Sequence, residues 1–205
     1  LHLAVGQIDE ARRILQTIDP SDDPAENARL WAFLKLAQQD YDGALQSAEA
    51  AAADAPLRLP VQLVLAMARY ASGLSPSTPT VYALQPNIPP EDLVRQDSES
   101  VRRRQLAIEA FRGLAGGRYG AAAQVDDWIL ACLCCDPTRE DEANALVAKR
   151  LAASPVDIPA LVAGLARDWP VDLGPALAAF DAKLTDGSAT EGEVETFARM
   201  SLVPG

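Results

Sequence analysis

The chain has 205 residues, of which 49% are hydrophobic and only 5% aromatic, and its formal net charge is −11. This hydrophobic content argues against a disordered chain, and the lack of β-branched runs with period two argues against a sheet. The acidic balance disfavours nucleic-acid binding, which needs clustered lysine and arginine. No stretch approaches the roughly 20 apolar residues that a membrane-spanning helix needs. We therefore expect an all-α protein without membrane insertion.

The start of the chain and its cysteines bear on the compartment in which the protein resides. The chain begins at Leu1 rather than at methionine, which suggests a piece of a longer protein, so an upstream signal or anchor leaves the compartment open. Cys132, Cys134 and Cys135 crowd one helix end, and an odd number in one cluster does not make a disulfide framework. On this ground a reducing compartment, the cytoplasm, is favoured.

Apolar residues at helical spacing, punctuated by proline and glycine, predict about ten helices. In chain order they fall in residues 7–20, 25–40, 41–56, 59–73, 98–117, 119–137, 138–154, 157–170, 174–187 and 190–202. Ser98 or Ser100 is the expected N-cap of the fifth helix. Two capping pairs are expected later in the chain, Thr138 with Asp141 and Thr190 with Glu193.

Residues 74–97 differ from the rest, because five prolines there forbid a continuous helix. They are Pro76, Pro79, Pro86, Pro89 and Pro90. The expected organisation is therefore helical repeats over 1–73, a proline-rich insertion over 74–97, a helical hairpin over 98–137 and a helical region over 138–205.

The helices recur at a regular interval. Small turn residues stand at Gly6, Gln39, Gly73 and Gly117, with spacings of 33, 34 and 44, and the last interval contains the insertion. Alanine follows five residues later at positions 11, 44 and 122, and Trp31-Ala32 matches Leu65-Ala66 at 34 residues. Such self-similarity is typical of repeat proteins.

This pattern resembles the tetratricopeptide repeat, a helix-turn-helix unit of 34 residues. The resemblance covers about residues 1–73 and 103–137. The matching residues are Trp31, Ala32, Ala44, Ala51 and Pro56, then Leu65, Ala66 and Gly73, with weaker matches at Gly6, Ala11, Ile18, Ala110, Gly117, Tyr119, Ala122 and Ile129. It implies an α-solenoid of antiparallel helical hairpins, in which Ala32, Ala44, Ala51 and Ala66 allow close helix contacts. Lys35 and Ala48 depart from the family, which has aromatic residues there, and the insertion replaces the second helix of the third unit.

The resemblance also implies a concave groove, lined by the first helix of each pair, in which a peptide binds. At matching offsets the groove residues are Arg29, Phe33, Leu36, Leu63, Met67, Tyr70 and Phe111, with Ala107 and Ile108 beside the last. The set lacks the Lys/Asn/Arg combination with which some family members clamp a carboxylate. Three interpretations stay open: an external peptide, residues 74–97 folded back into the groove, or plain inter-helix core.

Other chemical candidates have simpler explanations. His2 stands alone at the start of the chain, where a catalytic base is not expected. The three cysteines lack a second ligand pair for zinc and are expected to be buried. Asp126-Asp127 and the acids at 140–142 could suggest Mg²⁺, but the latter suit a helix start. Arg102-Arg103-Arg104 is expected to be a solvated helix face.

These observations predict no catalytic residue, metal site or cofactor. The leading hypothesis is a non-catalytic protein–protein interaction scaffold that binds a peptide or partner segment in an apolar groove. The alternative is a helical accessory region, regulatory or substrate-recruiting, of a larger multidomain enzyme or regulator. Self-association through uncapped repeat ends is a further option.

Overall fold

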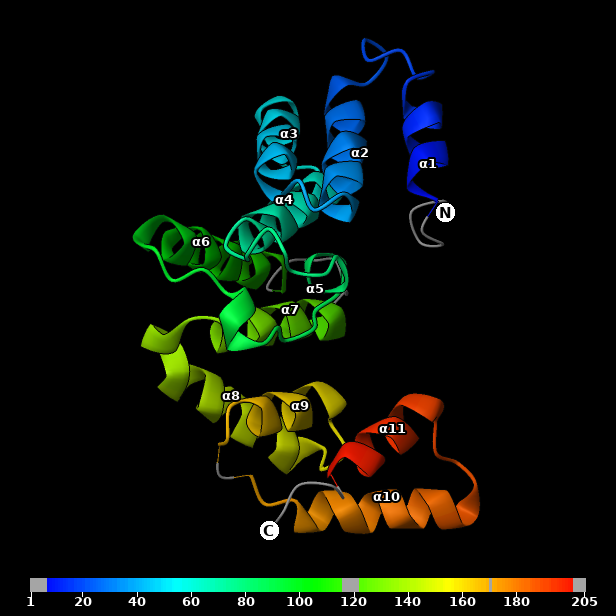
Figure 1. Cartoon of the computed structure of the whole chain (residues 1–205), viewed down its shortest axis with the longest axis vertical. Helices are drawn as coiled ribbons and strands as arrows, with labels where there is room; N and C mark the ends of the chain where they lie inside the picture. Colours follow the sequence, from blue (N-terminus) through cyan, green and yellow to red (C-terminus); the bar gives the residue numbers. More distant parts are fainter. Residues whose placement is uncertain (1–6, 116–121, 170, 201–205) are drawn as a thin grey trace. The chain divides into compact units, whose positions relative to one another are not determined.

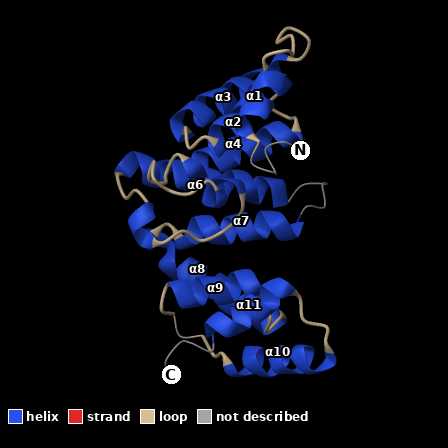
Figure 2. Cartoon of the chain, turned by 45° about the vertical axis from the view of Figure 1, so that its right-hand side comes forward, coloured by secondary structure: helices blue, strands red, loops and turns tan. Residues whose placement is uncertain are grey.

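The computed structural model describes residues 7–115, 122–169 and 171–200, and over these residues it is all-helical (Figures 1 and 2). The α-helices are α1 (Ile8–Leu15), α2 (Pro24–Ala37), α3 (Tyr41–Asp54), α4 (Leu59–Ala71), α5 (Val81–Leu84), α6 (Ser98–Ala115), α7 (Ala122–Cys134), α8 (Glu140–Ala153), α9 (Ile158–Ala166), α10 (Gly174–Asp186) and α11 (Glu191–Met200). Two 3₁₀ turns, η1 (Glu91–Leu93) and η2 (Pro137–Arg139), accompany them. The all-α class is confirmed.

Ten of these helices fall in the ten predicted stretches, and only α5 was not expected. No helix in the described ranges is both long and apolar enough to cross a membrane. His2, Gly6, Gly117 and Tyr119, which the sequence analysis used, lie outside the described residues.

Contacts within the chain divide it into two compact units, residues 1–136 and 137–205. The insertion predicted at 74–97 and the hairpin predicted at 98–137 both belong to the first unit, up to residue 136. Each unit is described by itself below.

The first unit is built on the hairpin of α2 and α3. Asp23 caps α2 by accepting a hydrogen bond from the Glu26 amide at 3.0 Å, and Pro24 occupies the first helical position. Gln39 turns the chain with a φ of 63°, and Asp40 caps α3 by accepting from the Gly43 amide at 3.0 Å. Three residues thus connect α2 and α3, a length typical of antiparallel helical hairpins.

Alanine makes the close contacts between these helices. Ala32, Ala44, Ala51 and Ala66 have no exposed surface, as expected of positions where helices approach closely. Ala48 is equally buried, so alanines make up most of the buried side of α3, with Tyr41 and Leu45 as its two large side chains. α3 packs against α2 on one side and α4 on the other, and this contact compensates for its small number of large apolar residues.

The array continues after the insertion. α4 packs against α6, which follows the insertion, and α6 packs in turn against α7. The insertion therefore connects two helices that pack against each other. The predicted N-cap of α6 is corrected, because Asp97 accepts the Ser100 amide at 3.0 Å and the Ser100 hydroxyl at 2.7 Å.

The second unit has a small apolar core around Leu161, Ala176 and Phe180. Asp157 caps α9 and also binds Arg150 through two hydrogen bonds of 2.9 and 3.0 Å, which ties α8 to the start of α9.

One of the two capping pairs predicted for the second unit is confirmed and the other is not. The Glu193 carboxylate accepts the Thr190 amide at 2.8 Å, and the Thr190 hydroxyl accepts the Glu193 amide at 3.3 Å, so the predicted capping box is confirmed. The predicted cap of α8 by Thr138 is wrong, because Thr138 lies inside η2 and Arg139 holds the N-cap position without a side-chain cap.

Candidate functional site

The structure places four of the seven predicted groove residues in the core. Leu36 and Tyr70 have no exposed surface, Met67 is 5% exposed, and Phe111 is fully buried, as are Ala107 and Ile108. The expectation that these side chains line an open groove is therefore wrong. Arg29, Phe33 and Leu63 alone among the predicted set keep partial exposure.

An aromatic cluster explains the burial of Tyr70 and Phe111. The Trp128 ring on α7 stacks on Phe111 with centroids 5.6 Å apart, and it meets Tyr70 edge-on at 5.5 Å. Such pairs add to the gain from burying apolar surface. Trp128 was not among the predicted site residues, because its contacts with Phe111 and Tyr70 depend on the tertiary fold and leave no signal in the local sequence.

The insertion packs against the two helices that carry the predicted groove residues. We call the side of α2 and α4 that bears Arg29, Phe33, Leu36, Leu63, Met67 and Tyr70 the α2–α4 face; Arg29, Phe33 and Leu63 are its partly exposed residues, and the other three are buried. The two triplets are related by the same 34-residue offset, so they occupy matching positions on the two helices. Helix α5 of the insertion packs against both α2 and α4.

Hydrogen bonds fix the insertion at the C-terminal ends of these two helices. The Tyr41 hydroxyl and the Gln39 side-chain amide both donate to the Thr78 carbonyl, at 2.6 and 3.2 Å. The Tyr70 hydroxyl lies 3.5 Å from the Asn87 carbonyl, at the outer limit of a hydrogen bond. Because both acceptors are backbone carbonyls, these contacts depend on the path of the insertion's backbone and not on the identity of its side chains.

Inside the insertion, the side chains that face the helices are small. Thr78 and Ala83 have no exposed surface, and Thr78 donates its hydroxyl to the Leu93 carbonyl at 3.1 Å. Val81, on the same short helix as Ala83, is 41% exposed. The insertion therefore has a buried side and an open side. The interpretation that residues 74–97 fold back over the predicted groove fits these contacts.

Two sets of backbone contacts join the two ends of the insertion. Leu74 and Val94 form an isolated antiparallel bridge, with the Ser75 amide donating to Leu93 at 2.8 Å and the Arg95 amide to Gly73 at 3.1 Å. Arg104 of α6 then donates from one terminal nitrogen to both the Gly73 and the Arg95 carbonyls, at 2.8 and 2.6 Å. One guanidinium thus binds both ends of the insertion.

Arg104 corrects the expectation of a solvated basic face. Arg102 is exposed and Arg103 pairs with Asp42 of α3 at 2.7 Å, but Arg104 has no exposed surface. Burial lowers the pKa of Arg104, while nearby Cys135 and Asp136 oppose that change. Gly73 makes room for it, because a Cβ there would lie 2.9 Å from two Arg104 side-chain atoms.

The three cysteines are buried, as the sequence predicted, and none of them forms a disulfide. Burial raises the pKa of the Cys132 thiol well above its usual value, so the thiol stays protonated and unreactive at neutral pH. Burial also raises the pKa of Tyr70, whose hydroxyl lies 3.7 Å from the Cys135 sulfur. Across the described residues, no group of three or more His, Cys, Asp or Glu side chains is placed to hold a metal ion.

Three residues of the α2–α4 face, Arg29, Phe33 and Leu63, keep partial exposure. Arg29 binds Glu26 through hydrogen bonds of 2.8 and 2.5 Å, and its guanidinium lies 5.5 Å from the Phe33 ring centroid. The ion pair and the ring contact hold the Arg29 side chain against the helix. Phe33 offers apolar surface next to this charged group, and Leu63 of α4 is also partly exposed.

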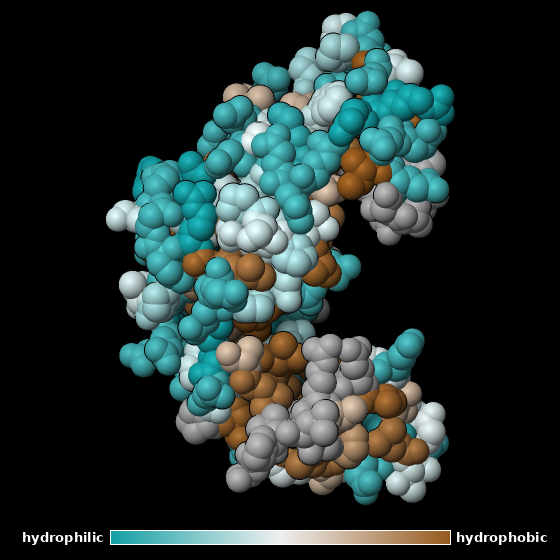
Figure 3. Space-filling model, in the orientation of Figure 1, coloured by the Kyte–Doolittle hydropathy of each residue, from teal (hydrophilic) through white to brown (hydrophobic). Residues whose placement is uncertain are grey.

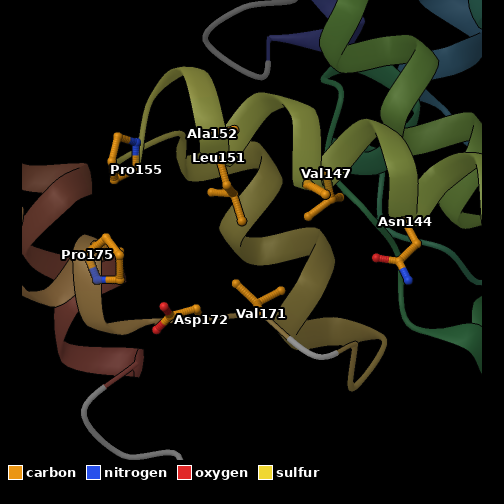
Figure 4. Close-up of a pocket in the computed structure, with 10 residues that line it drawn as sticks. Asn144, Val147, Leu151, Ala152, Pro155, Val171, Asp172 and Pro175 are labelled. Carbon is orange, nitrogen blue, oxygen red and sulfur yellow. The ribbon is translucent and has the colours of Figure 1, made fainter.

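The second unit contains a separate hollow of about 260 Å³ between α8, the segment before α10 and the first turn of α10. Figure 4 shows Leu151 and Val171 pointing into it from opposite sides, with Asp172 and Pro175 at one end and Asn144 at the other. The Asp172 carboxylate accepts the Gly174 amide at 3.0 Å, so it serves the start of α10. Figure 3 shows hydrophobic residues gathered on this unit. The lining suits an aliphatic group and offers no proton-transfer pair.

Comparisons with known proteins add no relative to this geometry. No family model, curated protein or solved structure matches the chain.

Proposed function

We propose that this chain is a non-catalytic protein-interaction module of the tetratricopeptide-like type, which binds a peptide segment on the α2–α4 face. The observation that carries the proposal is that this face already holds a polypeptide: α5 packs on α2 and α4, and the Thr78 carbonyl accepts hydrogen bonds from Tyr41 and Gln39. A face that accommodates one irregular segment through backbone contacts can accommodate another of similar chemistry.

The helical array supports the repeat assignment. α2, α3, α4, α6 and α7 pack in succession, and α2 also contacts α4, the next first helix in the repeat scheme. The matched alanines, Ala32 and Ala66, occupy equivalent and fully buried positions on α2 and α4. In such arrays each hairpin needs its neighbours to cover its apolar face. This is the arrangement in which successive first helices share one binding surface.

The uncovered residues indicate how a partner would be held. Phe33 supplies an aromatic contact and Leu63 an aliphatic one, while Arg29 stands at the edge with its charge partly satisfied by Glu26. Aromatic and arginine side chains dominate the binding energy of many protein interfaces. We therefore assign Phe33 as the main apolar anchor of the module.

The test uses a chain in which the face has been cleared. Since Ser75 and Leu93 are hydrogen-bonded across the base of the insertion, residues 76–92 can be replaced by Asn-Gly, the dipeptide of a tight two-residue hairpin. Peptides selected from a random display library on this loop-replaced chain are then titrated by fluorescence anisotropy. Phe33→Ala is expected to weaken their binding at least fivefold.

Leu57→Ala is the matched control, because Leu57 is 95% exposed in the turn between α3 and α4 and is not one of the residues that define the face. This variant should bind the selected peptides as the parent does. The proposal is wrong if no peptide is selected on the folded chain, or if the Phe33 and Leu57 variants behave alike.

A further inference from the structure

The insertion differs from the rest of the chain in charge. Between Arg69 and Glu91 the sequence contains no Asp, Glu, Lys, Arg or His, although 23% of the whole chain is charged. Five prolines lie in the same interval and limit the conformations of the free segment. An uncharged, proline-rich segment loses little conformational freedom on binding and needs no charged partner.

The attachment of the insertion is uneven. Its two ends are fixed by the Leu74–Val94 bridge and by the buried Arg104, which binds the Gly73 and Arg95 carbonyls. Its middle is held to α2, α3 and α4 by two hydrogen bonds to Thr78, the long contact to Asn87, and the burial of small side chains such as Ala83. A loop with a fixed base and a lightly held middle can leave its site without unfolding the helices beneath it.

We propose that residues 75–90 are an intramolecular ligand of the α2–α4 face, which competes with an external partner segment of the same chemistry: uncharged, proline-rich and extended. This inference rests on the proposed function and adds its regulation. While the segment is in place, it holds the C-terminal half of the face. The external segment binds there only when the insertion is displaced.

Competition of this kind lowers the apparent affinity for the external segment. The partner binds the fraction of molecules whose face is open, so its apparent Kd rises as that fraction falls. A change that expels the insertion without altering α2, α3 or α4 removes this effect. A substitution at Ala83 provides such a change, because Ala83 is fully buried on α5 and belongs to the insertion and not to the face.

The experiment compares two variants of the full chain, each of which carries one new glutamate at a different position on α5. Ala83→Glu places a charge on the buried side of α5, where it cannot remain without a partner. Val81→Glu places the same charge on the exposed side. The probe is a fluorescein-labelled synthetic peptide of residues 75–90, titrated into each chain. We expect Ala83→Glu to bind it at least tenfold more tightly than the unmodified chain, and Val81→Glu to match the unmodified chain.

The loop-replaced chain is titrated with the same peptide as an independent check that does not depend on the buried glutamate. Tight binding there and weak binding to the unmodified chain support the proposal. Equal binding to the unmodified chain and to the cleared chains overturns it, and so does failure of both cleared chains to bind. If the loop-replaced chain binds library peptides but not residues 75–90, the intramolecular ligand is wrong and the interaction module stands.

Discussion

Tyr41 joins the helical array to the insertion through a single hydroxyl. It is 5% exposed, and its hydroxyl donates to the Thr78 carbonyl at 2.6 Å. Tyr41→Phe removes that donor while Gln39 still serves the same carbonyl, so we expect a loss of about 0.5–1.5 kcal/mol in the free energy of unfolding. Urea denaturation measures it, with Tyr82→Phe in the insertion as the control. An unchanged midpoint would show that the hydrogen bond contributes nothing.

The same residue gives a pH signature. Burial raises the pKa of Tyr41 from 10.0 to about 12. Between these values the unfolded chain loses the phenolic proton and the folded chain keeps it, so the contribution of Tyr41 to stability is complete below pH 10 and falls as the pH rises toward 12. As the pH rises from 10 to 12, the free energy of unfolding should therefore fall less in the Tyr41→Phe variant than in the parent. Parallel curves for the two proteins would contradict this assignment.

Arg104 shows what sequence cannot give at the residue scale. Three consecutive arginines indicate a charged helix surface, and Arg102 and Arg103 fit that expectation. Only the third position faces α4 and the base of the insertion, and its partners are backbone carbonyls of Gly73 and Arg95. Backbone acceptors carry no sequence signature, so nothing in the local pattern distinguishes a buried arginine from its neighbours.

At the scale of the element, α3 depends on small side chains. Ala44 has no exposed surface where α3 meets its neighbours. Ala44→Leu forces three extra carbon atoms into that contact, and we expect overpacking to cost ~1–3 kcal/mol in the free energy of unfolding. Ala50→Leu, on the exposed side of the same helix, is the matched control. A thermal midpoint equal to that of the parent would count against the close-contact role of Ala44.

The capping box of α11 predicts an acid-dependent change. Lys183 and the Thr190 groups that donate to Glu193 lower the pKa of this carboxyl from 4.5 to about 2. Below pH 4.5 the unfolded chain takes up a proton that the folded chain does not, so this contribution is present above pH 4.5 and is lost as the pH falls toward 2. Glu193→Gln should flatten the pH dependence of unfolding in that window, as measured by circular dichroism. Glu191→Gln, an exposed neighbour, should leave it unchanged.

The helices were well predicted from sequence because their signals are local. Apolar spacing, prolines at first turns and glycine or proline stops defined ten stretches, and each holds one helix. The insertion was recognised only by its prolines. Its short helix α5 and its contacts with Tyr41 and Gln39 depend on residues nearly forty positions apart, and such pairings are set by the tertiary fold.

At the scale of the whole molecule, the 34-residue offset selected residues on α2 and α4 as the candidate site, because equivalent positions of a repeat are expected to share a face. It could not show that Met67, Tyr70 and Phe111 are buried. Tyr70 and Phe111 both contact Trp128 of α7, and α4 packs against α6 across the insertion. Contacts between residues so far apart in the chain leave no signal in a local pattern.

The most direct test of the account is to map where a peptide binds. Amide hydrogen exchange is measured by mass spectrometry on the loop-replaced chain, with and without a saturating peptide selected on it. We predict that protection rises in residues 24–41 and 59–71, which carry the α2–α4 face, and stays unchanged in residues 140–186. Protection that rises only in residues 140–186, around the hollow of the second unit, would contradict the central claim.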